Sequence, residues 1–237
     1  MRTTIAGLAV FTLAATVAGH ATFQQLWVAG EDQGSTCARL PANNNPVTSV
    51  SSSDIRCNVG GTKAAASKCS VPAGSTVTVE MHQQPGDRDC SKEAIGGNHF
   101  GPVIVYLSKV GDAASADGSS SWFKIFELGY DAATKTWGND LLNEGCGKQD
   151  IKIPSNIAPG DYLLRAETIA LHTASQSNGA QFYMTCYQIT VTGGGSANPS
   201  GVQFPGAYSS SDPGIKVDIW GNGFQEYKIP GPPVYSG

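Results

Sequence analysis

Four histidines are the residues with the clearest potential for metal chemistry in this sequence. The first of them, His20, follows an apolar stretch that ends in the small residues Val17–Gly19. This pattern is typical of a secretory signal peptide, so we expect residues 1–19 to be removed. His20 would then carry a free α-amino group beside its imidazole, and both nitrogens could bind one metal ion. The alternative is that a histidine follows the signal peptide by chance.

His99 lies in the glycine-rich segment Gly96–Gly101, immediately before an apolar run. A loop anchored by a buried strand suits a metal ligand, although this residue taken alone more simply predicts an exposed turn. His82 ends a predicted strand on the side of Thr78 and Glu80, opposite the apolar residues. We therefore expect His82 to be solvated or weakly hydrogen-bonded.

His172 follows a long β-rich run, and Gln181 and Tyr183 begin the next one. Because side chains two residues apart on a strand point to the same side, Gln181 and Tyr183 should face together. The segment Thr173–Ala180 is short enough for a hairpin, so the three side chains could meet at one end of a sheet. A core position for Tyr183 and a turn-capping role for Gln181 form an equally open alternative.

The acidic residues show no obvious catalytic pair. A glycoside hydrolase needs two carboxyl groups about 5 to 9.5 Å apart. Arg165 and Glu167 share one face of a predicted strand, which favours a structural ion pair. The other candidates are scattered through the sequence: Glu127, Asp140, Glu144 and Asp150. Spacing alone does not exclude a hydrolase, but it gives that reading little support.

Strand signals dominate the sequence, and long amphipathic helices are hard to find. Turn clusters rich in glycine, proline, asparagine and serine separate the apolar runs. This arrangement predicts an all-β sandwich with long loops. The predicted strands are Ser75–His82, Pro102–Leu107, Trp122–Leu128, Asp161–Leu171 and Gln181–Thr192.

Residues 20–237 are predicted to form one domain with no appended carbohydrate-binding module. The segment Thr192–Gly201 resembles a linker in composition. The 36 residues that follow it contain no cysteine, and so small a module normally needs disulfides or a metal. We therefore expect Val202–Gly237 to wrap back onto the same sandwich, with the proline-rich Tyr227–Gly237 along its surface.

Composition limits the possible partners. Charged residues make up 14% of the chain and the net charge is −4, which becomes −5 without Arg2 because residues 1–19 contain no acid. This balance excludes a basic nucleic-acid footprint and suits a neutral polysaccharide. Beyond the signal peptide we find no membrane segment. Six cysteines in a secreted chain predict disulfides, for which fifteen connectivities exist.

Five segments occur together in one order: "HATFQQLWV", "GGNHFGPVIVYLSKV", "IAPGDYLLRAETIALHTA", "NGAQFYMTCYQITVTGGG" and "SDPGIKVDIW" with the ending "YKIPGPPVYSG". In this order they resemble the fungal lytic polysaccharide monooxygenases of auxiliary activity family 9. The resemblance covers residues 20–237. It implies an immunoglobulin-like or fibronectin-like β-sandwich with a copper ion on a flat face.

The resemblance also implies the ligands of that ion. The α-amine and imidazole of His20 would bind copper with the imidazole of His99, and the hydroxyl of Tyr183 would approach axially. His172 and Gln181 would lie beside the ion and hydrogen-bond the oxygen species. Three nitrogen donors suit Cu(II). The amine must lose its proton to bind, so affinity should fall as pH drops.

The implied enzyme is secreted, monomeric and oxidative. It would cleave cellulose or a related β-1,4-glucan at C1 and/or C4, using O₂ or H₂O₂ and an external electron donor. Tyr227 matches a surface aromatic of the family and Tyr208 is a second candidate for sugar contact, with packing beneath the C-terminal tail as the alternative. Cys57 would pair with Cys186, which leaves three pairings for the other four cysteines.

Two other functions compete with this one. A secreted sandwich could bind copper or carbohydrate without turnover, and the absence of oxidised products would identify it. A hydrolytic cellulase would release non-oxidised sugars without a reductant and would resist EDTA.

Overall fold

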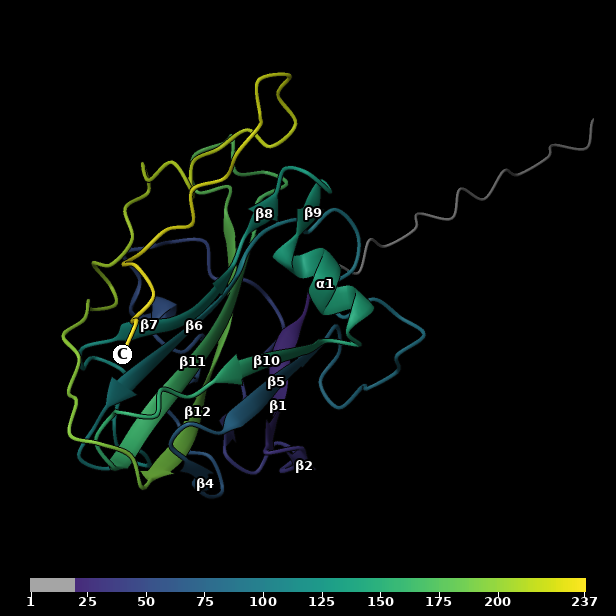
Figure 1. The fold of residues 1–237 in the computed structure, drawn as a ribbon. Coiled ribbons are helices and arrows are strands. Elements are labelled where there is room, and N and C mark those ends of the chain that lie inside the picture. Colours follow the sequence, from purple (N-terminus) through teal and green to yellow (C-terminus); the bar gives the residue numbers. More distant parts are fainter. Residues whose placement is uncertain (1–19) are drawn as a thin grey trace, which may run out of the picture.

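The computed structural model describes residues 20–237, so the predicted signal peptide lies outside the described part of the chain. Two β-sheets form the body of the molecule, with a short helix at one edge (Figure 1). The predicted all-β sandwich is confirmed. Within residues 20–237, no helix is long and apolar enough to cross a membrane.

The smaller sheet contains four antiparallel strands. One of its two inner strands, β5 (Thr76–His82), alternates apolar and polar residues as the sequence predicted, and it begins one residue later than expected. The other, β1 (Thr22–Val28), was not predicted as a strand; it pairs with β5 from end to end, with a register shift between Phe23 and Gln25. In order across the sheet the strands are β10 (Lys148–Lys152), β5 (Thr76–His82), β1 (Thr22–Val28) and β2 (Glu31–Asp32).

The larger sheet contains the longest strands, which are buried on both faces because each face is covered. Its two central strands read as nearly continuous buried runs, and this explains why the sequence showed little alternation there. The strands are β3 (Ala38–Arg39), β12 (Gln181–Thr192), β11 (Gly160–Ala170), β6 (Val103–Lys109) and β7 (Phe123–Leu128), with β4 (Cys69–Pro72) parallel to β12.

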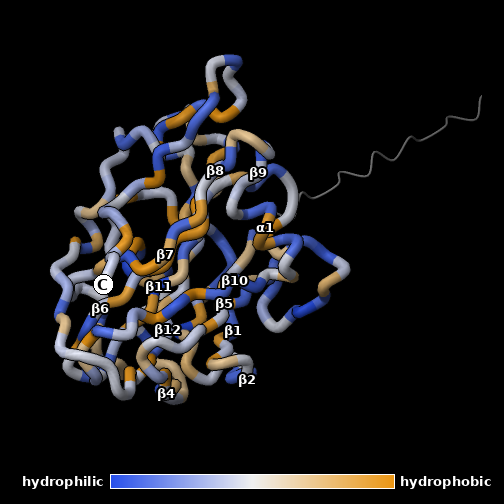
Figure 2. The backbone as a smooth tube through the Cα atoms, in the orientation of Figure 1, coloured by the Kyte–Doolittle hydropathy of each residue, from blue (hydrophilic) through white to orange (hydrophobic). Residues whose placement is uncertain are grey.

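One apolar core fills the space between the two sheets, and a second lies on the outer face of the larger sheet. Figure 2 shows hydrophobic residues along the central strands and mostly hydrophilic residues on the outer loops. The second core includes Trp122, Phe182 and Phe204, so the C-terminal part of the chain helps to cover the sheet.

The C-terminal segment packs on the sandwich. Trp122 and Val202 exchange backbone hydrogen bonds, and Tyr235 N–H donates to the carbonyl of Lys124 in β7. Thr192–Gly201 is not a free linker, because Gly195 N–H bonds to Ile157 and an isolated bridge pairs Ala197 with Ile157. The glycine-rich composition therefore marks a packed turn.

Four small elements lie outside the two sheets. The helix α1 (Gly138–Glu144) follows the two-stranded ribbon of β8 (Tyr130–Asp131) and β9 (Thr136–Trp137), and η1 (Ser53–Ile55) is a single 3-10 turn. Three disulfides pair all six cysteines: Cys37–Cys69, Cys57–Cys186 and Cys90–Cys146. The second is the pair that the resemblance implied.

Candidate metal centre

Four segments meet at one end of the sandwich. β1 and β12 begin there, β11 ends there, and the loop before β6 passes beside the end of β11. Leu171 N–H donates to the carbonyl of Phe100 at 2.8 Å, which holds the neighbours of His172 and His99 together. Gly101 makes this approach possible, because a Cβ there would collide with the carbonyl of Ile169.

Three of the four histidines gather at this end with Tyr183. The ring centroid of His99 lies 4.5 Å from that of His172 and 6.0 Å from that of Tyr183. The ring of His20 lies 6.5 Å from the ring of Tyr183. His82 is not part of this group.

His99 is held in a form that suits a ligand. Its side chain is 8% exposed, and its Nδ1 lies 2.6 Å from the carbonyl oxygen of Gly96. Because a carbonyl only accepts, Nδ1 carries the proton and Nε2 keeps its lone pair. Burial and the nearby rings of His172 and His20 lower the pKa of His99 to about 4. His99 is therefore neutral at neutral pH.

Tyr183 and Gln181 face together, as their spacing predicted. The Tyr183 hydroxyl donates to Gln181 Oε1 at 2.8 Å. Burial raises the pKa of Tyr183, so the phenol keeps its proton at neutral pH. The hairpin register pairs Gln181 with Ala170, which brings His172 to the same end. The buried Nδ1 of His172 has no hydrogen-bond partner within the described residues.

The donors gathered here fit copper, provided that the main-chain amine of His20 is counted together with the side chains. Within residues 20–237, no group of three or more His, Cys, Asp or Glu side chains is placed to hold a metal. Two imidazoles and a tyrosine are present, and a third nitrogen would have to come from the α-amine of a processed His20. Nitrogen-rich sites of this kind favour copper among divalent ions.

Trp220 is an exposed aromatic residue that the sequence reasoning missed. Its side chain is 55% exposed, its indole N–H donates to the carbonyl of His172 at 2.9 Å, and its ring lies 5.7 Å from that of Phe100. It therefore extends the metal-centre end of the molecule with a flat apolar ring. Its position in "KVDIW", at the end of an alternating stretch, was the available signal.

The two tyrosines that were predicted to contact sugar instead make packing contacts and hydrogen bonds within the protein. Tyr208 is 5% exposed and its hydroxyl donates to Glu167 Oε2 at 2.6 Å, so that prediction is wrong. Tyr227 is half-buried, packs edge-on against Trp137, and donates to the carbonyl of Gly214. The alternative of packing beneath the C-terminal tail describes both residues.

The expectation for His82 is also wrong. His82 is buried, and its Nε2 lies 2.8 Å from Glu80 Oε1. The loop after β5 folds back over this face and places Arg88 on both oxygens of Glu80. The predicted ion pair between Arg165 and Glu167 is confirmed, with 2.6 Å between Nη2 and Oε1.

This geometry defines a β-sandwich with three histidines and a tyrosine gathered at one end of its sheets. The profile of Auxiliary Activity family 9 (formerly GH61) matches residues 20–227. The chain belongs to this family.

Relatives with similar sequences span nearly the whole chain. AA9 family lytic polysaccharide monooxygenase B of Thermothielavioides terrestris is 61% identical over 99% of this chain and 73% of its own length. Monooxygenase E of Malbranchea cinnamomea is 60% identical over 99% of this chain and 93% of its own.

Solved structures agree. The protein CvAA9A is 36% identical with a TM-score of 0.84, over 91% of this chain and 98% of its own. A cellulose-active polysaccharide monooxygenase from M. thermophila is 36% identical with a TM-score of 0.77, over 92% and 100%. Membership supports a copper-dependent oxidoreductase that acts on polysaccharide.

Proposed function

We propose that this protein is a secreted copper-dependent monooxygenase that cleaves β-1,4-glucan, chiefly cellulose, by oxidation at C1 and/or C4. The observation that carries the proposal is the state of His99. Its Nδ1 is bonded to the Gly96 carbonyl and its Nε2 is left for a ligand bond, within a group that includes Tyr183. Such a carbonyl partner is what orients a metal-binding imidazole.

When bound, copper would supply the one-electron chemistry that activates O₂ or H₂O₂ after reduction by an external donor. His20 would hold it through its α-amine and imidazole, and His99 through Nε2. Tyr183 would lie on one side of the ion, with its hydroxyl hydrogen donated to Gln181 Oε1. Its buried ring would exclude water from that side.

His172 and Gln181 are placed to handle the oxygen substrate. His172 is half-buried beside His99, and burial lowers its pKa. A lowered pKa keeps the imidazole uncharged at neutral pH, so a ring nitrogen could accept a hydrogen bond or a proton from the oxygen species. Gln181 offers its amide N–H₂ while its carbonyl oxygen is engaged by Tyr183. Both groups would orient the oxygen species by hydrogen bonds.

A flat, uncharged polymer suits the surface beside this centre. Trp220 presents an exposed ring next to His172, and a ring of this kind can stack on a glucosyl unit. The cellulose-active relative from M. thermophila has the same fold at 36% identity. Together these observations favour cellulose among neutral polysaccharides.

The proposal requires signal-peptide cleavage immediately before His20. One additional residue would convert the α-amine into an amide and remove one nitrogen donor. Cleavage would then be a step in assembling the active site, and it would explain a histidine at the boundary between an apolar leader and the first strand.

The first experiment is a product assay by mass spectrometry. Copper-loaded protein with a verified His20 terminus is incubated with cellulose and ascorbate. We expect oxidised oligosaccharides only in the complete reaction, and the oxidised position reports C1 or C4. The control protein carries one extra residue before His20 and should be inactive. Non-oxidised sugars that form without reductant and in EDTA would establish a hydrolase. No products with copper bound would favour a binding protein or a different polysaccharide as substrate.

A further inference from the structure

The loop that carries His99 crosses the side of helix α1. Asn139, which is 1% exposed, donates from its side-chain amide to the carbonyl of His99. The backbone N–H of the same residue donates to the carbonyl of Gly101 at 3.1 Å. One helical residue therefore holds the chain at His99 and two residues beyond it.

Asn143 holds the other side of the loop. It lies one turn after Asn139, so both side chains project from the same face of the helix. Its Oδ1 accepts from Ile95 N–H at 2.9 Å and its Nδ2 donates to the Ile95 carbonyl at 3.1 Å. Gly96, whose carbonyl oxygen bonds to Nδ1 of His99, lies between the two fixed points.

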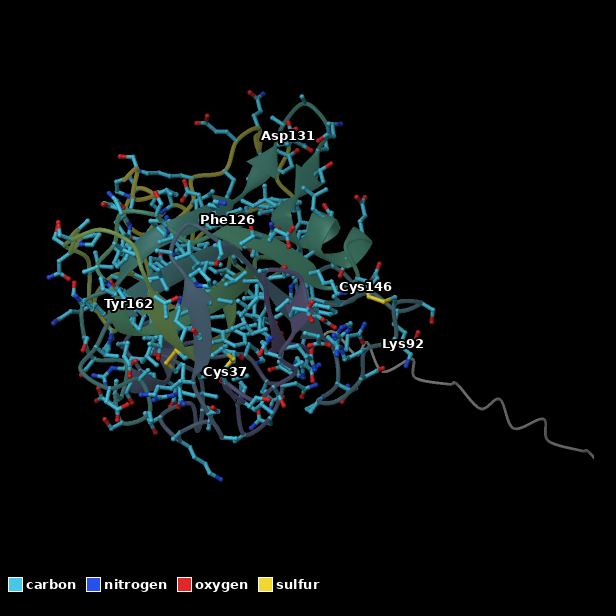
Figure 3. All side chains as sticks on the ribbon, turned by 60° about the horizontal axis from the view of Figure 1, so that its bottom comes forward. Cys37, Lys92, Phe126, Asp131, Cys146 and Tyr162 are labelled. Carbon is cyan, nitrogen blue, oxygen red and sulfur yellow. A yellow bond between two sulfur atoms is a disulfide. The ribbon has the colours of Figure 1, made fainter. Side chains whose placement is uncertain are left out.

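The helix is itself attached firmly to the sandwich. Thr168 in β11 donates to Asn139 Oδ1, and Thr168 pairs across the sheet with Tyr183. Gly138 lets the helix approach closely, because a Cβ there would lie 2.5 Å from the carbonyl oxygen of Leu128. Shortly after the helix, Cys146 is joined to Cys90 of the loop (Figure 3).

We propose that α1 positions the metal ligand His99, with Asn139 and Asn143 as the two positioning residues. This inference rests on the proposed ligand role of His99. The two asparagines fix both the backbone of His99 and the carbonyl that selects its tautomer. They would act on copper only through His99, and Asn139, by way of Thr168, links His99 to the strand that carries Tyr183.

The test compares Asn143→Ala and Asn139→Ala with the unchanged protein, each with a verified His20 terminus. The first readout is the tautomer of His99, measured by ¹⁵N NMR of the metal-free protein. We expect the unchanged protein to hold the Nδ1–H form and the variants to show a mixture. The second readout is Cu(II) affinity by calorimetry, which should fall about 10-fold, as for other residues that orient a ligand.

Two control variants and a third readout separate positioning from general stability. Asn156→Ala removes the hydrogen bond to the Tyr235 hydroxyl outside the His99 loop and should leave both readouts unchanged. Asn143→Asp keeps the acceptor for Ile95 N–H and should restore part of the Cu(II) affinity. The Cu(II) electron paramagnetic resonance spectrum should change in both alanine variants.

Lowered thermal stability with unchanged tautomer, affinity and spectrum would overturn the positioning role. Asn143 is only half-buried, so we expect Asn143→Ala to fold even if Asn139→Ala does not. Unchanged tautomer, affinity and spectrum in Asn143→Ala would then overturn the positioning role by themselves. Because the tautomer is measured without metal, it tests the asparagines even if the unchanged protein failed to bind copper. Failure of the unchanged protein to bind copper would overturn the proposed function instead.

Discussion

At the scale of single residues, the environment decides which histidines can bind a metal and which aromatic rings can contact a sugar. His99 and His82 are both buried, yet their partners differ. The Gly96 carbonyl can only accept, so neutral His99 must donate from Nδ1 and keeps its lone pair on Nε2. His82 places Nε2 on Glu80 and has that nitrogen occupied. A single hydrogen bond therefore separates a potential ligand from a structural residue.

Trp220→Ala should weaken binding to cellulose. Loss of an exposed ring that covers a sugar unit should cost about 1.5 kcal/mol, or roughly ten-fold in affinity. Binding to microcrystalline cellulose measures this effect. Trp220→Phe keeps a ring but lacks the N–H that reaches His172, so it should retain most of the affinity. Equal losses in both variants would show that the hydrogen bond, rather than stacking, is responsible.

Tyr227→Phe should change stability and not cellulose binding. The variant loses the hydrogen bond to the Gly214 carbonyl, which should lower the free energy of unfolding by about 1 kcal/mol. Denaturant titration gives the stability and the cellulose assay gives the affinity. Weaker cellulose binding at unchanged stability would return Tyr227 to the surface role that the family resemblance implied.

At the scale of elements, β5 anchors the loop that leads to His99. Glu80 on β5 is 1% exposed and accepts hydrogen bonds from His82, Arg88 and Trp27. Burial acts to raise the pKa of Glu80, but these hydrogen bonds outweigh it and lower the pKa to about 2. The ionised carboxylate therefore holds the loop through Arg88.

This anchor predicts a specific loss of stability in acid. Because the pKa of Glu80 is lower in the folded protein than in the unfolded chain, its contribution is present above about pH 4.5 and disappears as pH falls towards 2. The contribution is on the order of 3 kcal/mol. Denaturant titrations between pH 5 and 2.5 should show a flatter pH dependence for Glu80→Gln than for the unchanged protein. The exposed control Glu144→Gln should retain the original slope.

At the scale of the whole molecule, the Cys57–Cys186 disulfide joins residues much further apart in sequence than the Cys37–Cys69 disulfide. The sequence separations are 129 and 32 residues, and all four cysteines are buried. A longer closed loop restricts the unfolded chain more. The first bond ties the segment after η1 to β12 across the second core, and the second ties β4 to the segment before β3.

Replacing both cysteines of each pair with alanine tests this difference. The Cys57/Cys186 variant should lose about 1 kcal/mol more unfolding free energy than the Cys37/Cys69 variant, from loop entropy alone. Calorimetric unfolding of both variants provides the comparison, and all four substituted positions are buried. A larger loss in the Cys37/Cys69 variant would mean that local packing outweighs the restriction of the unfolded chain.

The sequence by itself determined the features that depend on local pattern. Alternation and apolar runs predicted five strands within one or two residues of their observed bounds, because side-chain periodicity is a local property. The spacing of Gln181 and Tyr183 determined that they face together. Cysteine count predicted disulfides, and the order of motifs indicated the family.

Only the tertiary structure decided which residues share a surface. Tyr208, Tyr227 and Trp220 lie close together in the sequence, yet the C-terminal segment buries Tyr208 and exposes Trp220 as it crosses the larger sheet. The strand pattern alone predicted that His82 faces solvent. In the structure His82 is buried, and the loop after β5 places Arg88 on its partner Glu80. Asn139 and Asn143 meet the loop that carries His99 for the same reason. Long-range packing sets these contacts, and no local pattern encodes the partner that another segment will supply.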